Sequence, residues 1–245
     1  EKCYSDYGSR ARELKDSGRK VIGYLSALCP VEILTAAGVV PIRLKGSVSE
    51  AVTKADAYME RMICPFVRNV FDVALKGRYA FLDGIVLSHQ CDSIDRTYDV
   101  WSYNLGFPYW HFINYPHLAD DPSIRFTDEI LRIFIGSLET FTGSTITDQA
   151  LAEAIRAHNE NRQAMRELYD LRKEDAPRIS GTEMMKVLMA AISLPVDEST
   201  ALIQSVTEEV KKRAPASGGG KPRILLVGDQ IDDIAIVNAI EGAEA

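Results

Sequence analysis

The sequence predicts an α/β protein built on an open, doubly wound parallel sheet. Short apolar runs typical of strands alternate with segments whose apolar residues recur at helical spacing, and glycines mark several helix ends. The run at residues 81–87 is apolar almost throughout, as expected for a strand covered on both faces. A strict alternation of strands and helices favours parallel strands joined by crossover helices.

The first strand–helix–strand unit spans residues 20–44. Residues 20–26 form a strand-like run, and Pro30 follows where the first turn of a helix tolerates a missing N–H. Gly38 is a typical residue after a helix end, and residues 39–44 form the next strand. This order predicts two neighbouring parallel strands.

Two more units follow the same pattern. A helix is expected over residues 61–76, before Gly77, and another over residues 92–101. The short run at residues 109–113 predicts the last strand, and a charged helix is expected before the sheet, at residues 4–17.

After residue 122 the sequence shows several helical patterns and few strand-like runs. We therefore divide the chain into an α/β domain at residues 1–122, a helical subdomain at 123–214, and a third part at 215–245. The third part begins with the connector PASGGGKP, and its run RILLVGD, at 223–229, predicts a strand that opens a second α/β domain. Because the chain ends soon afterwards, we expect a further C-terminal region. The helices expected in the subdomain cover residues 128–142, 147–172, 182–192 and 199–213.

Composition excludes several classes of protein. The chain has 245 residues, 46% of them hydrophobic, and a formal net charge of −7, which disfavours broad nucleic-acid binding. No apolar run reaches the roughly 18 residues of a membrane span, and no segment has the pattern of a signal peptide. We expect a cytoplasmic protein whose four cysteines are thiols or ligands, since disulfides are rare in that compartment.

Three of the four cysteines stand where a strand-like run gives way to a helix. Cys29, Cys64 and Cys91 are separated by 35 and 27 residues, too far apart for a local zinc knuckle. In an open α/β sheet, ligands gather outside the carboxyl ends of the strands, so these residues can meet at one edge. Thiolates are soft ligands for iron–sulfur clusters or zinc. Burial of three small apolar thiols is the alternative.

Two further residues are candidates for acid–base chemistry. Glu32 follows Cys29 by three positions and either assists proton transfer or stabilises the first turn of its helix. His89 precedes Cys91 by two positions and is either an acid–base group or a loop histidine. The chain has no P-loop and no G-x-G-x-x-G after a strand, so we do not expect it to bind ATP itself.

Five blocks of sequence, in order and over nearly the whole chain, resemble the 2-hydroxyacyl-CoA dehydratase and benzoyl-CoA reductase subunit family. They are GYLSALCPVEILTAAGVVPIRL, ICPFVRNVFDVALKGRYAFLDGIVLSHQCDSIDR, YDVWSYN followed by YWHFINYP, TDQALAEAIRAHNENRQAMRELYDLRK, and RILLVG.

The resemblance implies a fold and a chemistry. Members of this family have two flavodoxin-like α/β domains with a helical region between them, and three cysteines hold a [4Fe-4S] cluster. A homologous second subunit pairs with the first, and an ATP-dependent iron–sulfur activator supplies one electron at low potential. The substrate is an acyl-CoA thioester, which the dehydratases convert through a ketyl radical and the reductases through reduction of an aromatic ring.

The resemblance assigns roles to individual cysteines. Cys64, in CPFVRN, and Cys91, in its Cys-Asp motif, match two ligands of the cluster. The third ligand of the family comes from a C-terminal domain that this sequence does not reach. Cys29 stands where family members carry Cys or Ser near the cluster, so it is either the third ligand or a neighbour of the open iron. The alternative to an enzyme subunit is a non-catalytic α/β scaffold, or a partner subunit, that has lost the cluster.

Overall fold

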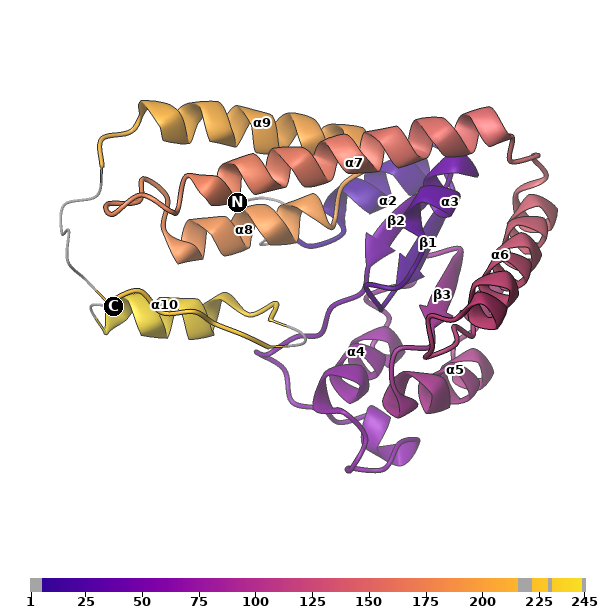
Figure 1. The fold of residues 1–245 in the computed structure, drawn as a ribbon. Helices are drawn as coiled ribbons and strands as arrows, with labels where there is room; N and C mark the ends of the chain where they lie inside the picture. Colours follow the sequence, from indigo (N-terminus) through magenta and orange to yellow (C-terminus); the bar gives the residue numbers. More distant parts are fainter. Residues whose placement is uncertain (1–5, 216–221, 229–230, 244–245) are drawn as a thin grey trace. The chain divides into compact units, whose positions relative to one another are not determined.

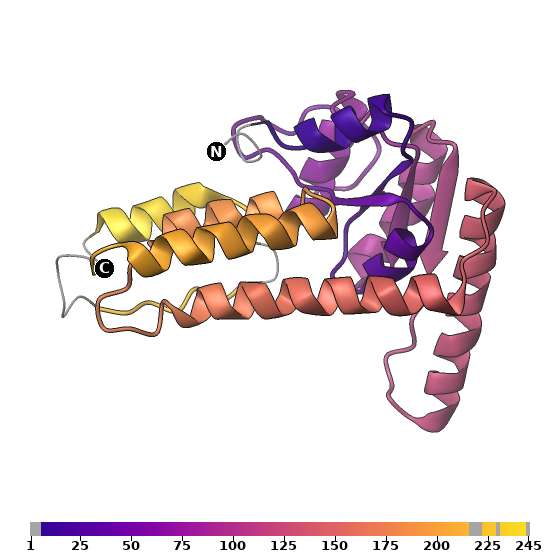
Figure 2. The ribbon, with the colours of Figure 1, turned by 90° about the horizontal axis from the view of Figure 1, so that it is seen from above.

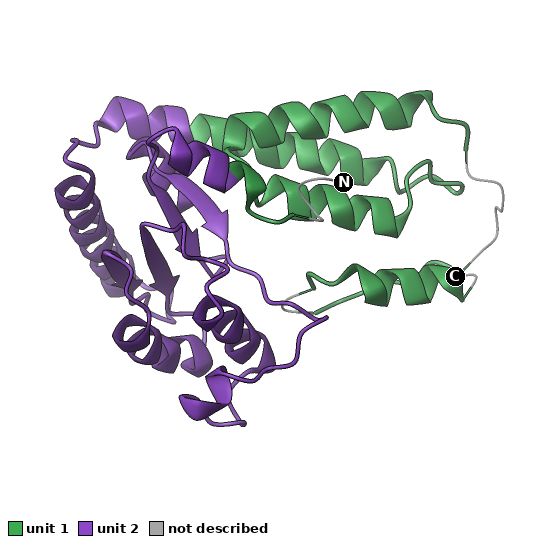
Figure 3. Cartoon of the chain, turned by 180° about the vertical axis from the view of Figure 1, so that it is seen from behind, with its two compact units in different colours: residues 1–10, 155–245 green, residues 11–154 purple. Residues whose placement is uncertain are grey.

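A computed structural model describes residues 6–215, 222–228 and 231–243. The chain divides into two compact units, one of residues 11–154 and one of residues 1–10 with 155–245 (Figure 3). Cys3, most of the predicted connector (216–221) and the last residue of the predicted strand, Asp229, lie outside the described residues.

The unit of residues 11–154 contains a four-stranded parallel sheet in the order β2-β1-β3-β4 (Figure 1). The predicted parallel sheet is therefore confirmed, and its strand order agrees with the first four strands of a flavodoxin-like sheet. The chain leaves β1 in one direction to form β2 and then crosses over to form β3. This reversal creates a topological switch point between the carboxyl ends of β1 and β3. The strands are β1 (Val21–Tyr24), β2 (Val40–Arg43), β3 (Gly84–Ser88) and β4 (Tyr109–Ile113).

Helices cover the sheet as the alternating pattern predicts. Gly38 and Gly77 both have positive φ, at 72° and 84°, where helices end, which is the conformation that glycine adopts without steric cost. The helices of this unit are α2 (Ser9–Asp16, which begins just before it), α3 (Val31–Ala36), α4 (Pro65–Leu75), α5 (Asp92–Asn104) and α6 (Asp121–Thr142), with a short 3-10 turn, η1 (Ala55–Ala57).

Apolar contacts fasten these helices to the sheet. Leu34 of α3 and Phe134 of α6 share one buried cluster with Ile22 and Val86 of the sheet. Helices α4 and α5 pack against each other, and α5 also packs against β3. In the α4–α5 pair the rings of Phe71 and Trp101 stack, with 5.4 Å between their centroids.

The other unit is helical. Its helix α8 lies between α9 and α10, as Figures 1 and 2 show from two directions. Ser180 and Glu183 form a capping box at the start of α8, which satisfies N–H groups that a helix end leaves unpaired. The helices are α7 (Asp148–Asp170), whose first turns belong to the α/β unit, α8 (Gly181–Ala191), α9 (Val196–Lys212) and α10 (Ile234–Gly242).

The strand expected at 223–229 is absent from the part of it that the structure describes. Residues 222–228 have neither helical nor strand conformation, and Leu225 and Val227 are largely exposed. A strand requires a neighbour to pair with, and among the described residues none pairs with this run. The helix expected after it is present as α10. The three-part division with boundaries at 122 and 214, and the second α/β domain, stay predictions.

Within the described ranges, no helix combines the length and the apolar character that crossing a bilayer requires.

Candidate functional site

The candidate site lies at the carboxyl edge of the sheet, beside the switch point. The loop of residues 25–30 follows β1, and the loop of residues 89–91 follows β3, the neighbouring strand. A hydrogen bond of 2.6 Å from Ser26 Oγ to Gln90 Oε1 joins the two loops, and Ser26 Oγ also accepts from the backbone N–H of Leu28. Sequence reasoning missed Ser26 and Gln90, although both are polar residues directly after a strand.

Cys64 and Cys91 occupy equivalent positions at the starts of two adjacent helices. Cys64 is the N-cap residue of α4, and Cys91 is the N-cap residue of α5. The backbone N–H of Cys64 donates to Ser93 Oγ, in the first turn of α5, over 3.4 Å. Cys64 is half-buried and Cys91 is exposed. Both thiols therefore lie beside the backbone N–H groups that a helix start leaves without a partner in the helix.

Cys29 has a different environment. It lies in the turn before α3, is 5% exposed, and belongs to the buried cluster that includes Ile33, Val86 and Tyr109. Burial raises the pKa of its thiol well above the ordinary range, and the charge of Glu32 raises it further. In this state Cys29 is a protonated, packed thiol.

Glu32 lies in the first turn of α3, as predicted, and the structure brings it close enough to Cys29 to affect its pKa. Burial raises the pKa of Tyr115 to about 12, and the charge of Glu32 contributes to this shift. Burial raises the pKa of Tyr24 as well, again with a contribution from Glu32. The hydroxyl groups of Tyr24 and Tyr115 therefore stay protonated.

His89 is held by three groups from other segments. Its Nδ1 lies 2.8 Å from Oδ1 of Asn114, and its Nε2 lies 2.9 Å from Oδ2 of Asp95. The Nε2 of His117 lies 3.1 Å from the Nε2 of His89. Sequence reasoning identified His89 but not these partners, because Asn114 and His117 reach it only through the pairing of β3 with β4.

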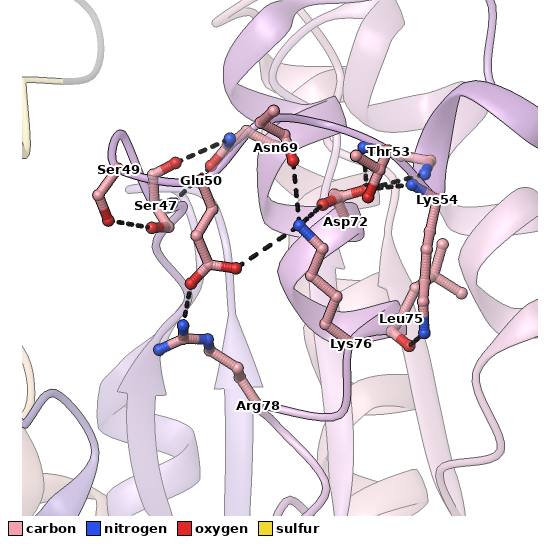
Figure 4. A network of polar contacts seen from close by, with 12 residues as sticks. Ser47, Ser49, Glu50, Thr53, Lys54, Asn69, Asp72, Leu75, Lys76 and Arg78 are labelled. Atoms are coloured by element: carbon pink, nitrogen blue, oxygen red, sulfur yellow. Dashed lines mark hydrogen bonds and ion pairs between the residues drawn. The ribbon is translucent and has the colours of Figure 1, made fainter.

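Helix α4, which carries Cys64, also anchors the long loop that precedes it (Figure 4). Asp72 is 1% exposed and accepts hydrogen bonds from the backbone N–H groups of Thr53, Lys54 and Ala55. Burial alone would raise the pKa of Asp72, but its hydrogen bonds to Lys76 and to these N–H groups lower it to about 2. A buried carboxylate thus fixes the path of the chain toward the candidate site.

The described residues supply some of the ligands that a thiolate-bound cluster needs. Cys64 and Cys91 supply soft donors at neighbouring helix starts, and Ser88 Oγ, at the end of β3, is buried with no hydrogen-bond partner among the described residues. Over the same residues, no group of three or more His, Cys, Asp or Glu side chains is arranged to hold a metal ion. Two of the three predicted ligands are therefore brought to adjacent elements, and the assignment of Cys29, Cys64 and Cys91 as ligands stays a prediction.

The fold and the site together define a class of protein: an α/β protein with a parallel sheet and free cysteines at two adjacent helix starts of its carboxyl edge. Comparison with known families gives the particular family. The family model described as "2-hydroxyglutaryl-CoA dehydratase, D-component" matches residues 27–245, and the chain belongs to this family.

Several relatives with assigned names are similar to this chain. A benzoyl-CoA reductase subunit of Thauera aromatica is 29% identical over 87% of the chain and 58% of its own length. The (R)-phenyllactyl-CoA dehydratase beta subunit of Clostridium sporogenes is 26% identical over 94% of the chain and 61% of its own length. The beta subunit of (R)-2-hydroxyglutaryl-CoA dehydratase from Acidaminococcus fermentans is 28% identical over 84% of the chain and 54% of its own length. The chain thus spans little more than half the length of these relatives.

Proposed function

We propose that this chain is part of an iron–sulfur subunit of an enzyme that transforms acyl-CoA thioesters by low-potential single-electron transfer. The observation that carries the proposal is the placement of Cys64 and Cys91 at the starts of two adjacent helices, beside a topological switch point. Membership in the dehydratase family and the names of the relatives support an acyl-CoA substrate.

In this proposal Cys64 and Cys91 bind a [4Fe-4S] cluster, and Cys29 is either the third ligand or a neighbour of the open iron. When bound, the cluster supplies single-electron transfer to the substrate. The N-termini of α4 and α5 place unpaired backbone N–H groups beside these two cysteines. The apolar cluster around Cys29 excludes water from the edge.

Proton handling is assigned to two side chains. His89 holds a proton at its imidazole and exchanges it with the substrate, as a general acid or base does. Glu32 is the second proton-transfer group, beside Cys29. The relatives act, by their names, on benzoyl, phenyllactyl and hydroxyglutaryl thioesters, so dehydration and ring reduction are both compatible with these assignments.

The proposal includes two protein partners. A homologous second subunit pairs with this chain, in line with the relatives' designation as subunits. An ATP-dependent iron–sulfur activator, which the family resemblance implies, delivers the electron. Cytoplasmic location stays a prediction.

The test is anaerobic reconstitution of the chain with iron and sulfide, followed by iron, sulfide and visible-absorption measurements. About four irons per chain, or per pair of chains, are expected. Cys64→Ala and Cys91→Ala should each lose the absorbance while the far-UV circular dichroism persists, and Cys3→Ala serves as the matched control. Full retention of the cluster in either variant would contradict the ligand assignment.

The same experiment separates a second candidate function. Within the described residues no complete ligand group is present, which favours a non-catalytic scaffold or partner subunit. A chain that takes up no iron under these conditions supports the scaffold. Zinc in place of iron and sulfide identifies a thiolate zinc site.

A further inference from the structure

The imidazole of His89 is enclosed by polar groups on both of its nitrogens. Asp95, from the first turn of α5, approaches Nε2 to 2.9 Å, and Asn114, just after β4, approaches Nδ1 to 2.8 Å. The backbone N–H of His89 donates to the carbonyl oxygen of Ile113 over 2.9 Å, which fixes the base of the side chain against β4. The side chains of His89 and Asp95 are 20% and 29% exposed, so water competes with these contacts only in part.

The chemistry of these partners distinguishes the two nitrogens. An ionised carboxylate only accepts hydrogen bonds, so the contact with Asp95 requires a proton on Nε2 of His89. An amide presents either an oxygen or an NH₂ group after a half-turn about its last bond, so Asn114 can pair with Nδ1 whether or not that nitrogen carries a proton. The Nε2 of His117 lies 3.1 Å from the Nε2 of His89, and when the His89 nitrogen carries the proton, His117 can only accept in this contact.

We propose that Asp95 is a positioning residue that fixes the neutral ring of His89 in the Nε2–H tautomer and leaves Nδ1 unprotonated, facing the side-chain amide of Asn114. The proposal deepens, and rests on, the role of His89 as a proton-transfer group, since it names the nitrogen that is open to a proton. This arrangement follows the general rule that the partner of one ring nitrogen sets the state of the other.

One further observation sets Asp95 apart from the other acidic residues of its helix. Its second oxygen, Oδ1, is buried and has no hydrogen-bond partner among the described residues. Asp99, one turn later on α5, is exposed. Among the described residues, the hydrogen bonding of the Asp95 carboxylate is thus confined to the oxygen that contacts Nε2 of His89. Asp99 provides a matched control on the same helix.

The test uses the full chain without added metal or substrate. The ¹⁵N chemical shifts of the imidazole rings are recorded by long-range ¹H–¹⁵N correlation at about pH 8.5, above the ordinary titration range of histidine. The signals of His89 are assigned by their loss in His89→Gln. The wild-type protein should show His89 with a protonated Nε2 and an unprotonated Nδ1.

Three variants complete the design. Asp95→Leu should lower the ratio of the Nε2–H to the Nδ1–H tautomer by about tenfold, the effect expected when a hydrogen bond to a charged group is lost. Asp95→Asn restores an oxygen acceptor and should recover most of the wild-type ratio. Asp99→Asn should leave it unchanged. Asn114→Leu, at an exposed position, should also retain the Nε2–H tautomer even where Asp95→Leu does not fold.

Two outcomes would overturn the proposal: a wild-type His89 that carries its proton on Nδ1, or a tautomer ratio that Asp95→Leu leaves unchanged. Because the spectra need no cluster and no turnover, this result is independent of iron binding. A fixed Nε2–H tautomer in a chain that takes up no iron contradicts the proposed function and leaves the role of Asp95 standing.

Discussion

At the scale of single residues, the three cysteines differ in their surroundings although their sequence contexts look alike. Each one precedes a helix, but Cys29 is packed in an apolar cluster whereas Cys91 is exposed and Cys64 is half-buried. Local sequence indicated a helix near each cysteine, although α4 begins at Pro65 rather than at the predicted residue 61. It did not show which loop folds inward, because that depends on the side chains of α3, α6 and the sheet.

This difference predicts the order in which the cysteines react. In the native, metal-free chain at about pH 8, Cys91 and Cys64 should be alkylated by iodoacetamide at least about tenfold faster than Cys29, because burial keeps Cys29 protonated and inaccessible. Mass spectrometry of timed samples gives the rates. In urea the three rates should converge, and a native Cys29 that reacts as fast as Cys91 would refute the buried assignment.

A second prediction at this scale concerns Asp72. Its pKa is lowered to about 2 in the folded protein, so it stabilises the fold by about 2 kcal/mol above the pKa of the unfolded chain. This contribution is lost as the pH falls from about 4 to about 2, because the folded carboxylate then becomes protonated too. Asp72→Asn should therefore lower the free energy of unfolding by about 2 kcal/mol at pH 7.

Urea unfolding at several pH values measures the effect. The difference between wild type and Asp72→Asn should shrink toward zero near the lower end of that range, and the exposed Asp99→Asn should show no comparable difference. If Asp72→Asn lowers the free energy of unfolding by the same amount at every pH, the carboxylate charge of Asp72 is not the source of the stabilisation.

At the scale of elements, one carboxylate joins α10 to α8. Glu241 accepts hydrogen bonds from the backbone N–H of Thr182 over 3.2 Å, from its hydroxyl over 2.7 Å, and from the backbone N–H of Gly181. Burial alone would raise the pKa of Glu241, but these hydrogen bonds lower it. Glu241 thus caps a helix that is distant in sequence.

Glu241→Ala should therefore release α10 before the rest of its unit unfolds. A loss of about 1–3 kcal/mol is expected, because N–H groups at the start of α8 lose their acceptor. Hydrogen exchange followed by mass spectrometry should show faster exchange in residues 234–242, with little change in α9. Glu241→Gln, which keeps one acceptor oxygen, is the control, and equal protection of α10 in Glu241→Ala and wild type would count against this role.

Most helices and strands were predicted from sequence, and the exceptions have physical causes. Helix α6 begins at Asp121 rather than at the predicted residue 128, because Asp120 caps it by accepting from the backbone N–H of Ser123 and Pro122 fits its first turn. These signals were present in the sequence. The absence of a strand at 223–228 has another cause. A strand forms only when a neighbouring strand pairs with it, and local sequence does not show whether such a neighbour is present.

At the scale of the whole molecule, the candidate site was predicted only as far as strand order could be inferred. The alternation of strands and helices placed Cys64 and Cys91 at one edge, and the structure brings their helices together through Ser93. Two partners of His89 could not be predicted, because Asn114 and His117 meet it only after β4 has paired with β3. The distances that define the site are therefore properties of the fold.

The hydrogen bond between Ser26 and Gln90 has a consequence for how a ligand reaches this edge. Ser26 is fully buried, so parting the loops after β1 and β3 would leave its O–H donor without an acceptor, at a cost of about 1–3 kcal/mol, although its oxygen would still accept from Leu28. The loops after β1 and β3 should therefore move together as one rigid surface at the switch point. A ligand arriving there meets a surface formed in advance, and the entropy of ordering these loops does not reduce its affinity.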